Sequence, residues 1–202
     1  MTTPHGATGT RRRPAGPPSA AVAGREGGIG RSSSKAAEAV SDDLRRGAGA
    51  LLDHRRRLAG LSLGSIAAFA GVAAYQTGII RHLPEPPLPL LDADAVDASG
   101  EAYQQLKTPD AALGIASSAI TLVLIGMGDR HRAQERPWVP LAMAAKVALD
   151  ALGGLVLTAE QATKHRTFCG WCLAATGAYL AMVPQVVPEA RVALRELRGA
   201  RR

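Results

Sequence analysis

Residues 58–80 read LAGLSLGSIAAFAGVAAYQTGII and contain no Asp, Glu, Lys or Arg. A stretch of this length is sufficient to cross the hydrocarbon core of a bilayer as an α-helix, which takes about 20 apolar residues. Its side chains are mainly Ala, Gly, Leu and Ser, and small residues of this kind allow helices to approach closely in lipid. The stretch therefore predicts a membrane-spanning helix.

Three further apolar stretches follow along the chain. Residues 111–128 and 168–187 also lack charged side chains, whereas residues 138–158 contain Lys146 and Asp150. A soluble helical bundle would place polar residues on the outward faces of its helices, and these stretches have few. The sequence therefore predicts an all-α fold, an integral membrane four-helix bundle over residues 58–187.

The segments that flank the predicted bundle are polar. Residues 1–35 are rich in Gly, Ala, Pro, Ser and Arg and show no apolar periodicity, which predicts a disordered basic tail. Residues 36–57 have apolar residues roughly on one side and end in three arginines, which predicts a juxtamembrane amphipathic helix. Residues 188–202 form a second basic tail.

The basic residues alternate between the two ends of the predicted spans. Lys and Arg number 11 in residues 1–57, 3 in residues 129–137 and 5 in residues 185–202, but 2 each in residues 81–110 and 159–167. By the positive-inside rule, we expect a multi-pass protein of the inner (plasma) membrane with both termini in the cytoplasm. Because the charges flank apolar stretches, the net charge of +7 favours membrane lipid as a partner and argues against nucleic acid.

Residues 81–110 form the long outer loop of this topology and carry six acidic residues. Several prolines near its start favour extended backbone. The stretch from Asp97 to Leu106 then predicts a short amphipathic helix, which Asp97 or Ser99 could cap.

The only two cysteines stand in the motif Cys169-Gly170-Trp171-Cys172, which opens the fourth apolar stretch. Residues three apart at a helix start lie on the same face, so the two thiols can approach disulfide geometry. The helix N-terminus and the preceding Lys164, His165 and Arg166 favour a thiolate. The motif therefore predicts a redox-active pair in which Cys169, nearer the cations, is the attacking thiol.

Other interpretations of the cysteine pair stay open. The pair could form an inert structural disulfide or simply pack. A tetrahedral zinc site would need two more ligands, and His165 and His82 are the only histidines on that side, so we expect no metal. Haem attachment would require His after Cys172, where Leu173 stands.

Lys146 and Asp150 lie one helical turn apart within the third stretch. Ionisable residues inside a membrane are often functional. The spacing predicts an ion pair that faces the bundle interior. Proton supply to a reduced quinone and pore lining are the alternatives.

Together these features resemble the vitamin K epoxide reductase family over roughly residues 58–187. The shared features are four spans, a long outer loop with a short helix, and a CxxC motif opening the fourth span. Residues 96–103, VDASGEAY, and the Leu113-Gly114-Ile115 segment are also similar to that family's passage from loop to second span. The resemblance implies that Cys169 and Cys172 are catalytic and pass electrons to a quinone. It would be of the menaquinone or ubiquinone class, bound near Trp171, Leu113 and Ser117.

The chain departs from the family pattern in the outer loop. Family members usually carry a second cysteine pair there, which relays electrons from a thioredoxin-like partner, and this chain has Ala95 and Ala98 at about those places. An external thioredoxin-like protein would therefore have to reach the CxxC motif directly. Two other functions stay open, a non-catalytic membrane scaffold with one structural disulfide and a small transporter or channel subunit that uses Lys146 and Asp150.

Overall fold

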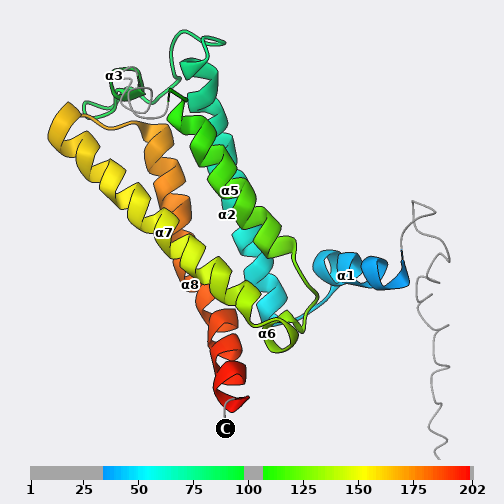
Figure 1. Cartoon of the computed structure of the whole chain (residues 1–202). Coiled ribbons are helices and arrows are strands. Elements are labelled where there is room, and N and C mark those ends of the chain that lie inside the picture. Colours follow the sequence, from blue (N-terminus) through cyan, green and yellow to red (C-terminus); the bar gives the residue numbers. More distant parts are fainter. Residues whose placement is uncertain (1–33, 98–106, 201–202) are drawn as a thin grey trace, which may run out of the picture. The chain divides into compact units, whose positions relative to one another are not determined.

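Four long helices account for most of the structure, a computed structural model that describes residues 34–97 and 107–200 (Figure 1). They are α2 (Ala50–Gln76), α5 (Asp110–Gly126), α7 (Trp138–Glu160) and α8 (Gly170–Gly199). The helix α8 packs against both α2 and α7, and α5 packs mainly against α2. Shorter elements lie in the connections: α3 (Ala93–Asp97), α6 (Arg132–Glu135) and the π-helical turn η1 (Gln161–His165).

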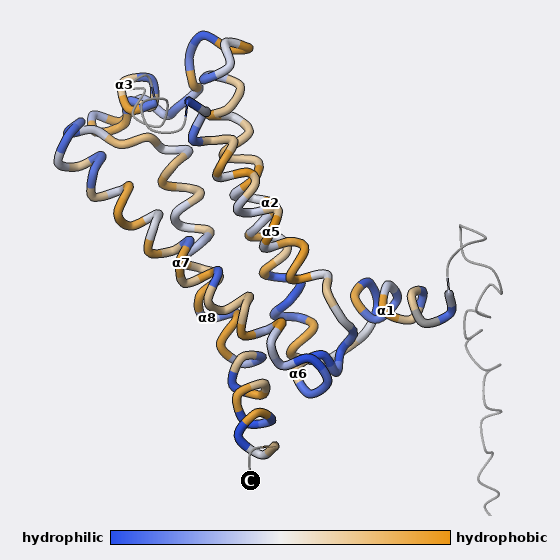
Figure 2. Tube along the Cα trace, in the orientation of Figure 1, coloured by the Kyte–Doolittle hydropathy of each residue, from blue (hydrophilic) through white to orange (hydrophobic). Residues whose placement is uncertain are grey.

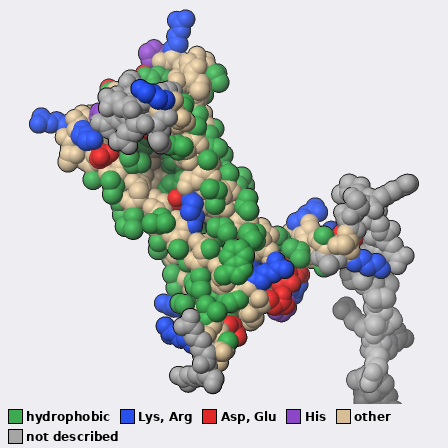
Figure 3. Space-filling view, viewed as in Figure 1, with side chains coloured by type: hydrophobic (Ala, Val, Ile, Leu, Met, Phe, Trp, Pro, Cys, Tyr) green, Lys and Arg blue, Asp and Glu red, His purple; other side chains and the backbone are tan. Residues whose placement is uncertain are grey.

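The apolar surface of these helices is that of a membrane protein. The helix α2, the continuous segment formed by α7 and η1, and α8 are each long and apolar enough to cross a bilayer. With 17 residues, α5 is also apolar and lies at the lower end of the length needed. Figure 2 shows hydrophobic residues along the middle of these helices, and Figure 3 shows charged side chains gathered mostly near their ends. The predicted all-α membrane helical bundle is confirmed.

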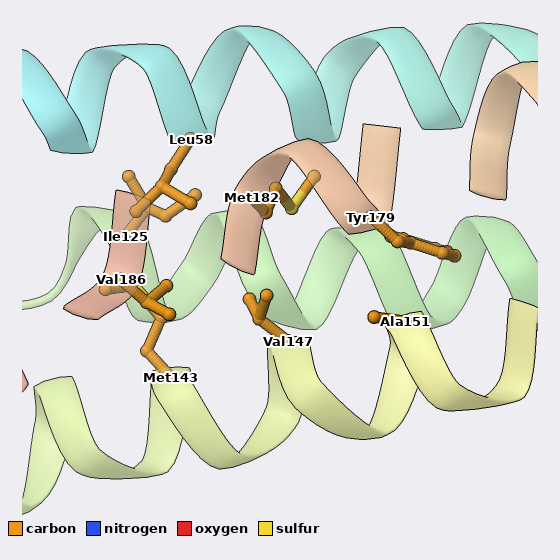
Figure 4. Packing of buried hydrophobic residues seen from close by; sticks show 8 residues of the cluster. All are labelled: Leu58, Ile125, Met143, Val147, Ala151, Tyr179, Met182 and Val186. Atoms are coloured by element: carbon orange, nitrogen blue, oxygen red, sulfur yellow. The ribbon is translucent and has the colours of Figure 1, made fainter. Parts of the chain in front are cut away.

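The core of the bundle is a cluster to which all four long helices contribute, and Figure 4 shows its side chains from close by. Met143, Val147 and Met182 are fully buried within it. Outward-facing residues of α7 are large and apolar, with Leu149 67% exposed and Leu152 60% exposed. In water this surface would be unfavourable, whereas lipid tails solvate it.

The chain divides into two units, residues 1–38 and 39–202. Of the first unit, the structure describes residues 34–38, the start of helix α1 (Lys35–Arg46). There the Oγ atom of Ser34 accepts a hydrogen bond from the backbone N–H of Ala37 (3.2 Å). The tail predicted over residues 1–35 lies almost entirely outside the described residues.

The prediction of a single helix over residues 36–57 is wrong. The helix α1 ends at Arg46, and α2 begins at Ala50. Between them, Gly49 has a φ angle of 140°, a backbone conformation that favours glycine and interrupts the helix. Arg55 therefore belongs to the first long helix, and its side chain is only 2% exposed.

Two buried arginines define one end of the bundle, which we call the arginine end. The Nη2 atom of Arg55 donates to the carbonyl of Ile125 (2.6 Å), and the Nη1 atom of Arg132 donates to the carbonyl of Leu124 (2.6 Å). The last carbonyls of a helix have no partner within it, so these guanidinium groups satisfy the end of α5. The predicted tail over residues 188–202 is helical as far as Gly199, since α8 continues through Pro184 and Pro188.

The short helix predicted between Asp97 and Leu106 lies, apart from Asp97, outside the described residues and stays a prediction. The described helix α3 begins at Ala93 and ends at Asp97, with Ala93 and Val96 buried. The Oδ1 atom of Asp92 accepts a hydrogen bond from the backbone N–H of Ala95 and so caps its first turn (2.9 Å). Residues 98–106, including the other predicted cap Ser99, lie outside the described residues.

Candidate functional site

The two cysteines lie at the N-terminal end of α8, at the end of the bundle that we call the cysteine end. Cys169 is the N-cap residue, and its Sγ atom accepts a hydrogen bond from the backbone N–H of Cys172 (3.2 Å). The backbone N–H of Cys169 donates to the Oε1 atom of Gln161, a buried residue of η1 (3.0 Å). The pair is thus held between α8 and the π-helical turn that precedes it.

The loop between α2 and α5 is fixed against the segment that enters α8. Leu91 and Phe168 form a parallel β-bridge. The backbone N–H of Asp92 donates to the carbonyl of Phe168 (3.0 Å), and the N–H of Phe168 donates to the carbonyl of Leu90 (2.9 Å). These bonds place the short helix α3 beside the cysteines.

Glu85 links the starts of α3 and α8 through one carboxylate. Its Oε1 atom accepts a hydrogen bond from the backbone N–H of Gly170, and its Oε2 atom accepts one from Ala93 (2.6 Å). A carboxylate is favourable at a helix N-terminus because the first N–H groups lack helical partners and carry partial positive charge. Glu85 therefore contributes to the placement of α3 against the CxxC motif.

The two thiols differ in access. Both cysteines are free thiols; Cys169 is completely buried, whereas Cys172 is half-buried. The hydrogen bond with Cys172, burial and the negative charge of Asp97 raise the pKa of the Cys169 thiol. This direction is opposite to the thiolate expected at Cys169 from the helix N-terminus and the preceding cations, of which Lys164 pairs with Glu160 (3.3 Å).

Asp97 completes the site, and its place beside the thiols was not predicted. The Sγ atom of Cys172 donates to the Oδ1 atom of Asp97 (3.8 Å), and a carboxylate oxygen lies within 4.8 Å of both sulfur atoms. Its Oδ2 atom is buried and has no hydrogen-bond partner among the described residues. Burial raises the pKa of Asp97 to about 6, against smaller lowering effects of its hydrogen bonds with the cysteines.

Comparison with known protein families decides the identity of the fold. The chain matches the model of the vitamin K epoxide reductase family over residues 57–187, a range that takes in the CxxC motif, α3, α5 and α7. The chain belongs to the vitamin K epoxide reductase family. No curated protein and no solved structure matches it. Membership indicates a membrane oxidoreductase-like function of the thiol–quinone type.

Trp171 of this vitamin K epoxide reductase family member packs at the cysteine end. Its Nε1 atom donates to the carbonyl of Pro84 (3.1 Å). Its ring lies so close to α2 that a Cβ atom at Gly71 would be 3.0 Å from it. The indole thus connects α8 to α2 and to the loop, and its predicted contact with a quinone stays a prediction.

The other two predicted quinone contacts, Leu113 and Ser117, are not brought together with the cysteines by any described contact. The side chain of Leu113 is 44% exposed on α5. Ser117 belongs to a separate polar cluster, in which its Oγ atom donates to Asp150 (2.8 Å) and contacts the Nζ atom of Lys146 (2.6 Å). The predicted ion pair between Lys146 and Asp150 is present, with a shortest N–O distance of 2.6 Å.

The zinc set considered from the sequence is not assembled. Among the described residues, Asp97, Cys169 and Cys172 are the group that brings three potential ligand atoms together. His82 lies apart from them, because its Nδ1 atom pairs with Asp94 (2.7 Å). A closed structural zinc site takes four ligands, so this group is one short.

Sequence reasoning missed Glu85, Asp97 and Gln161 as parts of the site. Asp97 was considered only as a helix cap. Its place in the VDASGEAY segment, on which the resemblance rests, was the signal that could have linked it to the cysteines. Nothing in the sequence singled out Glu85 or Gln161, which reach the site only through the folded loop and η1.

Proposed function

We propose that this protein is a membrane thiol oxidoreductase that passes two electrons from the Cys169–Cys172 dithiol to a quinone of the menaquinone or ubiquinone class. The proposal is carried by one observation: the only two thiols lie together at a helix N-terminus, one of them accessible, within the region that matches the family. In the reaction, two thiols and one quinone give one disulfide and one quinol. Two electrons and two protons pass to the quinone, so the equation balances.

The electron donor in this proposal is an external thioredoxin-like protein. Its thiolate attacks the oxidised pair through a mixed disulfide and regenerates the dithiol. Cys172 is the sulfur that such a partner reaches, because Cys169 is completely buried. The exposed Ala95 on α3 offers no relay thiol, so exchange goes directly to the CxxC motif.

The proposed topology places the cysteine end outside the cytoplasm. Four passes through the plasma membrane, with both termini cytoplasmic, follow from the distribution of Lys and Arg. Labelling of Cys172 in intact cells with a membrane-impermeant maleimide tests this arrangement, with the Cys172→Ser variant as the blank. Labelling that occurs only after cell lysis would show the opposite orientation, with the cysteine end in the cytoplasm.

Catalysis is tested on the reduced protein in detergent. The oxidant is duroquinone, whose fully substituted ring gives no stable thiol adduct. We expect quinol formation to match the loss of two thiols per chain, and both Cys169→Ser and Cys172→Ser to abolish it. If the thiols stay reduced, or if the variants consume quinone equally, the enzyme proposal fails.

A non-catalytic membrane scaffold is the second candidate function. The described part of the loop favours it to the extent that α3 carries no cysteine. Under this proposal the cysteine pair only stabilises the start of α8. Wild-type cellular function in the Cys169→Ser and Cys172→Ser variants would support the scaffold.

A further inference from the structure

We infer that Asp97 is a catalytic residue of the proposed reaction, the base that takes the proton from the Cys172 thiol before sulfur reacts with the quinone. The inference deepens the proposed function and rests on it. It assigns chemistry to a residue of the α2–α5 loop, in a chain whose loop lacks relay cysteines. Asp97 contacts a reacting atom directly, since the Cys172 Sγ atom donates to its Oδ1 atom (3.8 Å).

The position of Asp97 is fixed by contacts that other residues of α3 make with the preceding loop. Asp97 is the last residue of α3, whose first backbone N–H is bound by Glu85 (2.6 Å). Asp94 of the same helix accepts a hydrogen bond from the backbone N–H of Leu83 (2.9 Å) and pairs with His82 (2.7 Å). A base held in this way needs little reorganisation when the proton moves.

The environment of Asp97 destabilises its ionised carboxylate, which points to a functional role for this residue. A buried carboxylate oxygen without a hydrogen bond destabilises a fold, and such perturbed groups concentrate at functional sites. The charged and titratable groups with the largest effects on the pKa of Asp97 are Glu85, Asp110, Cys169 and Cys172, and Tyr75 of α2 also interacts with its charge. None of them is a cation, so within the described part of the chain the carboxylate belongs to no ion pair and is available to receive a proton.

The proposed steps account for every proton and electron. Asp97 removes the Cys172 proton, and the electron pair left on the sulfur forms a C–S bond to a quinone ring carbon. The Cys169 sulfur then attacks the Cys172 sulfur, so the S–S bond forms and the C–S bond breaks, with its electron pair passing to the ring. The protons from Asp97 and Cys169 go to the two quinol oxygens. General base catalysis of this kind typically accelerates a step by about 10²–10⁴-fold.

The test is a single-turnover measurement with the full-length protein in detergent. The reduced protein is mixed with excess duroquinone between pH 5 and 8, and quinol formation is followed. The variant is Asp97→Asn, which keeps the shape of the side chain and removes the base. The matched control is Asp92→Asn, which changes an exposed carboxylate near the start of the same helix to a residue that caps equally well.

We expect Asp97→Asn to slow quinol formation at neutral pH by about 10²-fold. In the wild type we expect the rate to rise near pH 6, where the Asp97 carboxylate becomes ionised, and in Asp97→Asn this rise should be absent. Asp97→Glu should recover part of the rate, and Asp92→Asn should behave as the wild type.

Thermal unfolding of the same reduced proteins separates catalysis from structural damage. Asp97→Asn removes a buried carboxylate charge, so it should melt no lower than the wild type while reducing quinone more slowly. A lower melting temperature together with slower quinone reduction would indicate a distorted site and overturn the assignment. Equal rates of quinol formation in Asp97→Asn and wild type would also overturn it and leave the proposed function intact. If the wild-type protein does not reduce duroquinone, both the assignment of Asp97 and the proposed function fail.

Discussion

Arg132 and Glu189 form a buried, two-pronged ion pair that joins α6 to α8 at the arginine end. The Nε and Nη2 atoms of Arg132 lie 2.6 Å and 2.5 Å from the two carboxylate oxygens of Glu189. The side chains are 0% and 3% exposed. Arg132 also donates to the carbonyl of Met127 (2.9 Å), so this one side chain connects the end of α5 to α8.

Removing the acid of this pair should strongly destabilise the protein. In Glu189→Gln, the Arg132 guanidinium stays buried without its counter-charge, and breaking a buried pair on one side typically costs about 3–5 kcal/mol. We expect a clearly lower melting temperature in detergent, followed by tryptophan fluorescence. Glu196→Gln, at an exposed position of the same helix, is the control and should melt as the wild type. Equal melting of the two variants would show that the pair contributes little.

Gly114 should not tolerate a side chain. A Cβ atom at this position would lie 2.7 Å from ring atoms of Phe69, so Gly114→Ala must separate α5 from α2 or displace the ring. Overpacking of this kind typically costs about 1–3 kcal/mol. Gly126→Ala in the same helix is the matched control, because nothing lies within 4 Å of its Cβ position and alanine favours the helix. The melting temperature should therefore fall in Gly114→Ala and stay at the wild-type value, or rise slightly, in Gly126→Ala.

The long helices were predictable because length and apolarity alone determine which segments can cross a bilayer. The cysteine pair was predictable as a motif at a helix start, since residues 169–172 open the fourth apolar stretch. The break between α1 and α2 was missed because residues 36–57 were interpreted as one helix that ends at the three arginines. In the structure, Arg55 is buried and bonds to carbonyls that the sequence cannot place beside it.

The chemistry around the cysteines depends on contacts between segments far apart in the chain. Asp97 and Cys172 are 75 residues apart, and the Leu91–Phe168 bridge, Glu85 and the hydrogen bond of Trp171 to Pro84 help to bring them together. The local sequence around Cys169 suggested a cation-stabilised thiolate. The hydrogen bond with Cys172, burial and a neighbouring carboxylate act against that expectation, and the last two arise from tertiary structure.

The two thiols should react with alkylating agents in a fixed order. Cys172 is half-buried and Cys169 is completely buried, so limited N-ethylmaleimide should modify Cys172 first. We expect a rate ratio of about ten or more, because the Cys169 thiol is completely buried and its pKa is raised. Mass spectrometry of peptides after timed quenching measures it. The prediction fails if Cys169 is labelled first.

The ion pair between Lys146 and Asp150 should be more sensitive to the loss of one partner than to the loss of both. Asp150→Asn leaves the Lys146 ammonium with Ser117 as its remaining described partner, and we expect a loss of roughly 2–4 kcal/mol. The double change of Lys146→Met with Asp150→Leu removes both charges and should be less destabilising than the single one. Comparison of the melting temperatures tests this. Loss of substrate transport in the stable double variant would instead support the transporter interpretation.

Asp97 should make stability depend on pH. Its pKa of about 6 in the fold lies above the usual value of 3.8, so folding favours the protonated form. The corresponding stability is fully present below the usual value and is lost as pH rises through about 6. Asp97→Asn cannot ionise, so relative to the wild type it should gain on the order of 1 kcal/mol between pH 4.5 and 7.5, a figure reduced for partial exposure. The measurement is the difference in melting temperature between the two proteins across this range. A difference that stays constant with pH would show that Asp97 titrates normally in the fold.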